Sequence, residues 1–402
     1  MNDAWKNEQV LIVGGGIGGL TAALALERQG IPSQVIEQAA EFKEIGAGIQ
    51  LGPNAFWMLE HLGLVPRISE LAVFPNNLIM RDSMTGAEIT RISLGEAFRK
   101  RFHHPYALIH RADLLNVLLD ACRKSKLIRL DASQKVVDVE EVGNAVAVKA
   151  ASGNTYRGAA LIGADGLWST IRQIVVGDGK PKPAGHITYR AVLPRTEVLE
   201  EYRWQDMAFW AGEKVHLVLY PLRTGELFNL VAVFHSNRYE EGWDSFGDPA
   251  ELHERFAGKC APVRMLLDKI ESWRMWVLCD RPPIKEWSKG RITLLGDAAH
   301  PMLQYLAQGA CMSIEDAVCL ADKVVAAKGD YASAFQAYQQ ARYLRTGRVQ
   351  IMARIYGEFY HAGGVAQELR NLMLGGRTPE DAMAGMDWLY GKPVELLGAA
   401  AV

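Results

Sequence analysis

Two kinds of hydrophobic periodicity divide the chain. An apolar run at residues 10–13 is followed by helical spacing over residues 20–28 and by a second apolar run at 33–36. The middle of the chain instead carries short runs rich in β-branched and aromatic residues, separated by turn residues, at 185–192, 207–210, 215–220 and 227–234, with two more at 77–82 and 88–92. From about residue 330 to 357, apolar positions again recur with helical spacing. The patterns predict a βαβ unit, an antiparallel sheet and a helical end.

The order of these patterns predicts an α/β protein whose first domain is interrupted. We expect a Rossmann-like unit from residues 1–75, 101–182 and 285–330. A substrate-binding β-sheet domain is expected from residues 76–100 and 183–284, and a helical C-terminal region from residues 331–402. The small, apolar tail, residues 395–402, either packs on a partner subunit or frays.

Composition excludes several classes of protein. The chain has 402 residues, 49% of them hydrophobic, and a net charge of −2, so it lacks the basic balance of a nucleic-acid-binding protein. Its five cysteines form no C-x-x-C pair, which is typical of reduced thiols in a cytoplasmic protein. We find neither an export signal at the N-terminus nor an apolar stretch long enough for a membrane helix.

A glycine motif follows the first apolar run. Gly14, Gly16 and Gly19 form G-x-G-x-x-G between the strand and helix patterns, and Glu37 ends the second strand. The first glycine permits a tight turn, the second lets a pyrophosphate approach the backbone at a helix N-terminus, and the third lets helix and strand pack closely. A carboxylate at position 37 can accept hydrogen bonds from a ribose diol. The combination predicts a dinucleotide site.

Two later apolar strands each end in an aspartate. Asp165 lies in G-A-D-G and Asp297 in G-D-A-A-H-P. Ligands bind at the carboxyl ends of strands in open α/β sheets. Either aspartate alone is explained as a strand-end turn residue, but two of them beside a dinucleotide motif favour a binding role.

Together with His110-Arg111-Ala112-Asp113-Leu114, these motifs resemble, in this order, the single-component FAD-dependent aromatic hydroxylases. The resemblance covers nearly the whole chain and implies non-covalent FAD, with NADH and O2 as co-substrates. The presence of one nucleotide motif rather than two fits a transiently bound NADH. The implied FAD-binding residues are Gly14, Gly16, Gly19, Glu37 (adenosine ribose), Arg111 (pyrophosphate), Asp165 (FAD and NADH region), Asp297 (ribityl chain), and Gly309 and Ala310 (flavin N1–C2=O edge).

One position departs from the family. Many relatives have G-Q-G-A-N where this chain has Ala307-Gln308-Gly309-Ala310-Cys311. The glycine that starts the helix is kept, so a backbone contact with flavin is still expected. A side-chain contact from the last position is not.

The stretches 46–54, 216–223 and 301–306 are similar to those of family members that hydroxylate 3-hydroxybenzoate to gentisate through a flavin C4a-hydroperoxide. This similarity implies a hydroxybenzoate substrate. The helical, apolar C-terminus makes a homodimer our expectation for the assembly. Salicylate hydroxylases share the flavin motifs and remain an alternative. A non-catalytic flavin-binding protein is the alternative from another class.

A phenol has a pKa of about 10, so a hydroxylase needs a base or acceptor at the phenol oxygen. Strand alternation places His216, Val218 and Tyr220 on one face and apolar residues on the other. The strand is either a pocket wall or a half-exposed strand with a polar face. The resemblance favours the first, with His216 activating the phenol, Gln304 assisting it, and Tyr220 and Tyr106 contacting substrate. Alternatively, Gln304 satisfies a loop and Tyr106 packs beside a proline turn.

The other histidines carry weaker signals. His300 precedes Pro301 in a turn whose backbone we expect to matter more than the side chain. His103 and His104 suggest a metal only superficially, since no carboxylate or thiol completes a site, so we expect a solvated loop and no metal.

Overall fold

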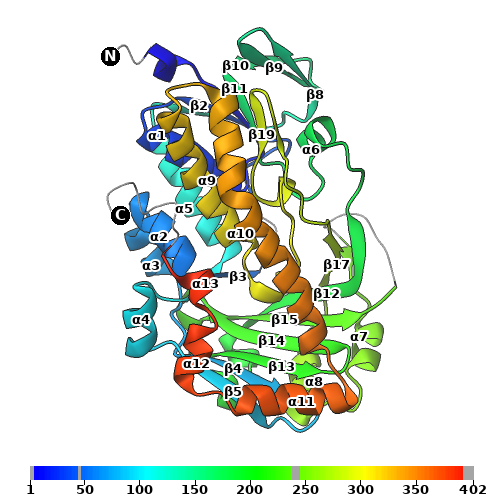
Figure 1. Cartoon of the computed structure of the whole chain (residues 1–402). Coiled ribbons are helices and arrows are strands. Elements are labelled where there is room, and N and C mark those ends of the chain that lie inside the picture. Colours follow the sequence, from blue (N-terminus) through cyan, green and yellow to red (C-terminus); the bar gives the residue numbers. More distant parts are fainter. Residues whose placement is uncertain (1–3, 44–46, 238–244, 393–402) are drawn as a thin grey trace.

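The computed structural model describes residues 4–43, 47–237 and 245–392 (Figure 1). The apolar tail at 395–402, the first three residues and Gly46 of the stretch 46–54 lie outside the described residues. Short helices and turns in the first half of the chain connect the strands: η1 (Ala4–Asn7), α2 (Pro53–His61), α3 (Val65–Leu71), α4 (Glu96–Phe102) and α6 (Thr170–Val175).

A six-stranded sheet forms the first layer, in the order β18-β19-β11-β1-β2-β7. Its strands are parallel except for β18. The strands are β1 (Val10–Val13), β2 (Ser33–Ile36), β7 (Ile128–Asp131), β11 (Ala160–Gly163), β18 (Ser288–Lys289) and β19 (Ile292–Leu294). Helices α1 (Ile17–Arg28), α5 (Arg111–Lys124) and α9 (Gly309–Ala326) contribute to the same hydrophobic core. The predicted βαβ unit is confirmed.

Two small sheets flank this unit. A three-stranded antiparallel sheet of β8 (Val136–Val142), β9 (Ala145–Ala150) and β10 (Thr155–Gly158) lies at the end of the molecule near the N-terminus (Figure 1). A two-stranded sheet joins β3 (Gly48–Leu51) to β6 (Ala107–His110). The hydrophobic pattern did not single out either sheet.

The second large sheet has eight strands in the order β16-β17-β12-β15-β14-β13-β4-β5. Its strands are β4 (Asn77–Asp82), β5 (Glu88–Ser93), β12 (Lys182–Pro194), β13 (Met207–Gly212), β14 (Val215–Leu222), β15 (Leu227–His235), β16 (Ser245–Phe246) and β17 (Arg274–Asp280). All six predicted runs form strands here. The sheet departs from the antiparallel expectation at one pair, since β13 and β4 run parallel. Strands β16 and β17 were not predicted.

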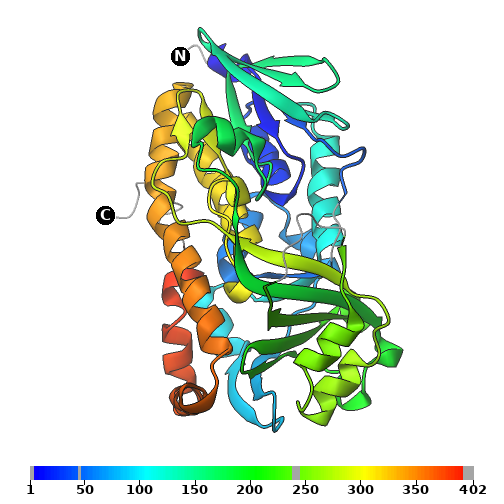
Figure 2. The same cartoon turned by 90° about the vertical axis from the view of Figure 1, so that its right-hand side faces the viewer.

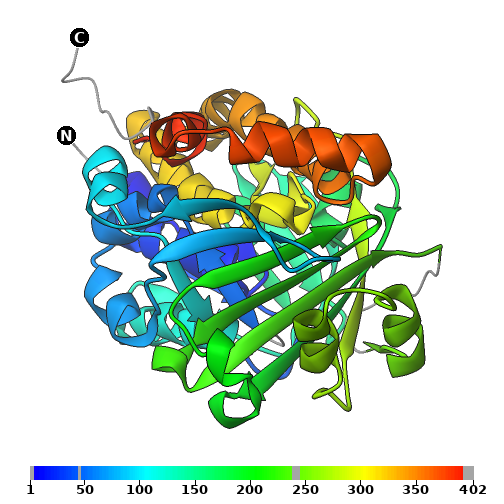
Figure 3. The same ribbon diagram turned by 90° about the horizontal axis from the view of Figure 1, so that it is seen from below.

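The two faces of this sheet have different neighbours. Val215, Leu217 and Leu219 of β14 belong to a core that α7 (Pro249–Arg255) and α8 (Ala261–Leu267) complete (Figure 3). The alternate residues of β14 face the other way, toward the α/β unit. The predicted alternation is therefore confirmed, because a strand covered on both sides sends successive side chains into different layers.

The C-terminal helices tie the two large sheets together. Helix α10 (Tyr331–Tyr360) spans about 45 Å at 1.5 Å per residue and runs along both sheets (Figures 1 and 2). It begins at Asp330, whose side chain caps the Ser333 amide. Helices α11 (Gly364–Gly375), α12 (Pro379–Ala384) and α13 (Asp387–Tyr390) follow. Among the described residues, no helix combines the length and apolarity needed to cross a bilayer.

Candidate active site

A cavity of about 1290 Å³ lies between the α/β unit and the eight-stranded sheet. This exceeds the ~300–1,000 Å³ of a pocket for one drug-sized ligand. Its walls come from the glycine loop after β1, the ends of β11 and β19, the start of α9, and the face of the eight-stranded sheet opposite α7 and α8. The volume suits a large cofactor together with a small substrate.

The glycine loop has the backbone geometry that the motif predicts. Gly14 has φ +110°, and a Cβ there would lie 2.3 Å from the carbonyl oxygen of Ala164. A Cβ on Gly19 would lie 1.9 Å from the carbonyl oxygen of Gly14. Gly16 is the N-cap of α1 and lines the cavity. Bare backbone at the N-terminus of α1 therefore faces the cavity.

Glu37 is fixed at the rim of this loop. One carboxylate oxygen accepts a hydrogen bond from the Gly15 amide at 2.6 Å, and the other accepts one from the Ala39 amide at 2.8 Å. Its side chain still lines the cavity. A carboxylate oxygen has more than one acceptor site, so both oxygens keep capacity for a diol.

The two strand-end aspartates differ in their roles. Asp165 accepts hydrogen bonds from the amides of Thr170 and Ile171 and from the Ser169 hydroxyl, so it caps α6 while lining the cavity. Burial raises the pKa of Asp165, although these hydrogen bonds act to lower it. Asp297 is exposed between buried residues on the cavity wall. The turn role is therefore observed for Asp165, whereas Asp297 presents its carboxylate to the cavity.

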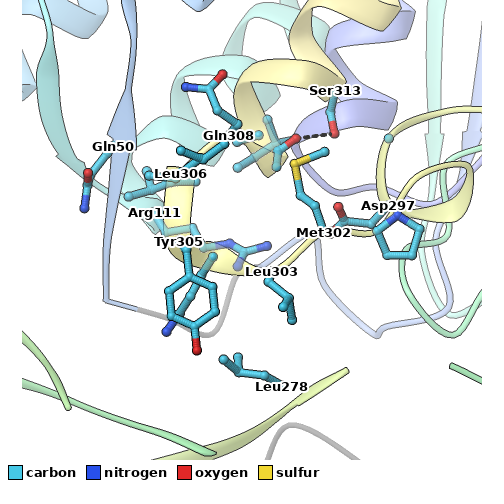
Figure 4. Close-up of a pocket in the computed structure, with 18 of the residues that line it drawn as sticks. Gln50, Arg111, Leu278, Asp297, Met302, Leu303, Tyr305, Leu306, Gln308 and Ser313 are labelled. Atoms are coloured by element: carbon cyan, nitrogen blue, oxygen red, sulfur yellow. Dashed lines mark hydrogen bonds between the residues drawn. The ribbon is translucent and has the colours of Figure 1, made fainter. Parts of the chain in front are cut away.

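Helix α9 points its first turn at the cavity. Gln308, Gly309, Ala310 and Ser313 line it, and the Ser313 hydroxyl donates to the Gly309 carbonyl at 2.9 Å (Figure 4). Cys311 is buried outside the lining, with its thiol 3.7 Å from the Gln50 carbonyl oxygen. The departure from G-Q-G-A-N thus leaves the backbone amides of the helix start in place.

These features fit FAD. The glycine loop has no room for a Cβ at Gly14 or Gly19. Glu37 directly follows β2, the strand next to β1. Asp297 and Arg111 line the cavity between the glycine loop and the start of α9. Positive charge at a helix N-terminus stabilises the negative charge of a reduced flavin. The adenosine end would lie by Glu37, the pyrophosphate by Gly16 and Arg111, the ribityl chain by Asp297 and the flavin edge by α9.

His216 lies on the sheet side of the cavity. Its Nδ1 is 2.6 Å from Nε2 of His361, which caps the C-terminus of α10. Burial, and then the neighbouring His186, lower the pKa of His216 to about 3, so the ring is neutral near neutral pH. Because Nδ1 of His216 is bonded to His361, Nε2 of His216 is the nitrogen that a ligand in the cavity can reach. The sequence did not reveal His361 as its partner.

Gln304 also lines the cavity and lies on the turn η6 (Gln304–Leu306). Its amide donates to the Thr188 hydroxyl at 2.8 Å, and its carbonyl accepts from Arg190 at 2.6 Å. Arg190 lies 5.3 Å from the ring centroid of Trp276, and its Nε is buried without a hydrogen-bond partner among the described residues. Gln304 thus fixes an arginine on the cavity wall that sequence reasoning missed. The arginine lies in a strand run with no local motif.

Tyr220 and Tyr106 meet at Gln50. The Tyr106 hydroxyl donates to the Gln50 side-chain carbonyl, and Tyr220 bonds to the same side chain. Burial raises the pKa of Tyr220 to about 12, so both hydroxyls stay protonated. Both rings line the cavity, and Tyr106 also packs in the core with Tyr390. Packing and cavity contact are therefore compatible for Tyr106.

Two expectations about histidines need correction. His104 is buried, not solvated, because its ring packs edge-on against Trp57 at 4.4 Å. Only His103 lies exposed in that loop. His300 is buried and lies 2.5 Å from Asp316, so its side chain as well as its backbone holds the turn.

Three further histidines gather beside His216. His186, His235 and His361 each have a ring nitrogen within 4.8 Å of the others. His361 uses both of its ring nitrogens in hydrogen bonds, to His216 and to His235 at 3.0 Å, and the Tyr305 hydroxyl bonds His186 at 2.6 Å. Figure 4 shows Tyr305 pointing from η6 toward the side of Leu278, with Gln308 on the opposite side. Hydrogen bonds thus join His216, His361 and His235, and the Tyr305–His186 pair packs against them through ring contacts.

Comparison with known proteins agrees with this geometry. The family model described as "FAD binding domain" matches residues 7–350. The chain is also similar to the solved structure of Klebsiella pneumoniae HpxO complexed with FAD and uric acid, with a TM-score of 0.85, 27% identity, and coverage of 96% of this chain and 97% of that one. The chain belongs to the family of FAD-dependent aromatic hydroxylases.

Within this family, two curated relatives are similar over almost their full length. A protein of Aquipseudomonas alcaligenes named 3-hydroxybenzoate 6-hydroxylase 1 is 46% identical, over 96% of this chain and 98% of the relative. A 3-hydroxybenzoate 6-hydroxylase of Polaromonas naphthalenivorans is 44% identical, over 97% and 98%.

Proposed function

We propose that the protein is an FAD-dependent monooxygenase that uses NADH and O2 to hydroxylate 3-hydroxybenzoate para to its hydroxyl group, giving gentisate. The main observation behind this proposal is that two walls of the cavity each present one of the required groups. A neutral imidazole, His216, lies on the sheet side, and the N-terminus of α9 lies on the α/β side. Near-full-length relatives named for this reaction support it.

When bound, FAD supplies hydride acceptance from NADH and the activation of O2. The chain's own residues prepare the aromatic ring. Nε2 of His216 accepts the proton of the phenol oxygen, because a phenolate donates electrons to the ring far better than a phenol does. Apolar residues of the wall, such as Val218 and Leu278, limit water next to the reacting carbon.

Arg190 is our candidate for the substrate carboxylate. Its guanidinium lines the cavity and is held there by Gln304 and Trp276. A planar guanidinium matches a carboxylate in two parallel hydrogen bonds. Gln304 therefore supports both ends of the substrate site, by fixing Arg190 and by lying on the turn that faces His216.

Two alternatives predict different results in an activity assay. Salicylate hydroxylation to catechol would require the site to accept a substrate whose hydroxyl and carboxylate are on adjacent ring carbons. A non-catalytic flavin-binding protein would need no buried base on the opposite wall, and His216 argues against it.

The decisive experiment is a substrate screen. Purified holoenzyme is mixed with NADH and either 3-hydroxybenzoate, salicylate or 4-hydroxybenzoate, and products are identified by mass and retention time. Gentisate from 3-hydroxybenzoate supports the proposal. Catechol from salicylate with 3-hydroxybenzoate inert would reject it, and a flavin that none of these acids lets NADH reduce would favour the non-catalytic alternative.

We also propose a cytoplasmic homodimer. Two exposed apolar stripes at helical spacing support the dimer. One stripe on α10 contains Leu344, Ile351 and Ile355, and one on α11 contains Val365, Leu369, Leu372 and Met373. Leu344 and Leu372 are 70% and 73% exposed. Several large apolar side chains exposed on neighbouring turns of a helix are typical of an interface between subunits. Most of the cysteines are buried, as is usual for thiols in a reducing compartment.

A further inference from the structure

The histidine cluster forms a continuous chain from the cavity wall toward the surface. Nδ1 of His216 lies 2.6 Å from Nε2 of His361, and Nδ1 of His361 lies 3.0 Å from Nε2 of His235. His216 and His361 are buried, whereas His235 at the end of β15 is half-buried. Each contact joins the Nδ1 of one ring to the Nε2 of the next. A chain with this regular order can pass a proton in one direction by switching every tautomer.

The three segments that carry the chain are bonded to one another through their backbones. The Lys214 amide, just before β14, donates to the His361 carbonyl at 3.1 Å, and the His235 amide donates to the Lys214 carbonyl at 3.0 Å. The Tyr305 hydroxyl holds His186 at 2.6 Å, and the rings of His186 and His235 lie 4.2 Å apart between centroids. The three rings of the chain are thus held in place by elements of both the sheet and α10.

Electrostatics explain why His216 needs such partners. Burial lowers the pKa of His216 to about 3 and that of His361 further, so neither ring stably holds a positive charge. In the described part of the molecule, His186 faces His216 and His361, Arg370 faces His361, and Glu358 and Lys214 face His235. Among them Glu358 favours a positive charge, and it faces the half-buried end. A proton accepted at the cavity must leave His216 again, and the end near the surface is the most favourable place for it to go.

We propose that His361 and His235 relay the phenol proton from His216 to solvent, so that a bound phenol ionises without a buried imidazolium. This inference rests on the proposed function. The phenol O–H bond breaks and an Nε2–H bond forms on His216. The Nδ1 proton of His216 passes to Nε2 of His361, the Nδ1 proton of His361 passes to Nε2 of His235, and the Nδ1 proton of His235 leaves to water. All three rings end neutral, and the reverse transfer after turnover restores the tautomers.

The test follows ionisation directly rather than turnover. FAD-loaded enzyme is mixed in a stopped-flow instrument with 3-hydroxy-4-nitrobenzoate, whose phenolate absorbs in the visible range. We expect ionisation in His361→Gln and His235→Gln to be at least about tenfold slower than in wild type, since a general base contributes ~10²–10⁴-fold. Glutamine keeps a hydrogen bond but cannot switch tautomers. His253→Gln, at a surface histidine of α7, is the matched control and should behave as wild type.

Two further measurements separate a relay from a structural role. His361→Ala should regain ionisation rate with added imidazole, and the wild-type rate should fall in D2O more than the His361→Gln rate does. Wild-type ionisation rates in both glutamine variants, with flavin content retained, would overturn the relay. So would a stoichiometric metal ion in the purified protein that is lost from His235→Gln, because the rings would then be ligands. If the nitrophenol ionises normally but no gentisate forms from 3-hydroxybenzoate, the proposed function fails while the relay stands.

Discussion

Nε2 of His300 lies 2.5 Å from Oδ2 of Asp316, and both side chains are buried. Asp316 also accepts hydrogen bonds from the Gly296 amide at 3.1 Å and from Nε of Arg342 at 2.7 Å. One carboxylate therefore connects the G-D-A-A-H-P turn, α9 and α10. This contact fixes the turn that presents Asp297 relative to the helix whose N-terminus faces the flavin position.

We expect Asp316→Asn to lower the free energy of unfolding by about 3–5 kcal/mol, because it leaves the buried Arg342 without one of its charged partners. Thermal and urea unfolding of the holoprotein measure this. The control is Glu70→Gln, which removes an exposed ion pair with Arg67 and should change stability by less than about 1 kcal/mol. Equal effects of the two substitutions on stability would contradict the stabilising role of the buried Asp316–Arg342 ion pair.

The same carboxylate predicts a pH dependence. Burial raises the pKa of Asp316, but His300 and Arg342 outweigh it and lower the pKa from 3.8 to about 2. Because the pKa is lower in the folded chain, the stabilisation is complete above pH 4 and is lost as the pH falls from about 4 toward 2. The stability difference between wild type and Asp316→Asn should therefore shrink over this range. A difference that stays constant would show that the charge of Asp316 is not responsible.

Gly14→Ala should weaken FAD retention. Its Cβ would lie 2.3 Å from the Ala164 carbonyl oxygen, in a backbone conformation that L residues rarely adopt. The loop must shift, and its amides then no longer face a pyrophosphate. The ratio of absorbance at 450 nm to that at 280 nm in the purified protein gives the flavin content. Gly95→Ala, before α4, is the control and should retain FAD fully, because its φ of −74° suits an L residue and its Cβ would meet only the Ser93 hydroxyl, at 3.4 Å.

His216→Gln should abolish most hydroxylation while FAD stays bound. The loss expected for a general base is ~10²–10⁴-fold in the rate of product formation. NADH oxidation without matching product would appear as H2O2, since activated oxygen then finds no phenolate. Parallel assays of NADH, gentisate and H2O2 measure this, with His253→Gln as the control. Unchanged product yield would remove His216 from the mechanism.

Arg190→Met should raise KM for 3-hydroxybenzoate by roughly 10–100-fold, the cost of losing a charge-assisted hydrogen-bond pair of ~1.5–3 kcal/mol. The Kd of 3-hydroxybenzamide, which lacks the carboxylate, should change much less. Arg274→Met is a matched control on the neighbouring strand, where Arg274 lies over the exposed ring of Phe246. If both ligands weaken equally, Arg190 has a role other than binding the carboxylate.

Leu344→Glu combined with Leu372→Glu should shift a dimer to monomer, because charges would enter both apolar stripes. Light scattering coupled to size-exclusion chromatography gives the mass. Val137→Glu, at an exposed apolar position on β8, is the control and should leave the mass unchanged. A wild-type monomer at micromolar concentration would reject the proposed homodimer.

The sequence by itself determined the features that depend on neighbours along the chain. The turn at Gly14, the alternation around His216 and the strand ends at Asp165 and Asp297 follow from local sterics and from the period of two along a strand. The six predicted strands follow for the same reason, and the long helix after Asp330 follows from the helical spacing of its apolar residues. Motif order then indicated the family, and the domain division inferred from it remains a prediction.

Tertiary structure decided which distant groups meet. His216 and His361 are 145 residues apart and their contact leaves no spacing signature, because only the packing of α10 against the sheet brings them together. The burial of His104 depends in the same way on Trp57, and the position of Arg190 on Gln304. Local propensity cannot encode such pairs, since the energy of each depends on desolvation and geometry that exist only in the packed chain.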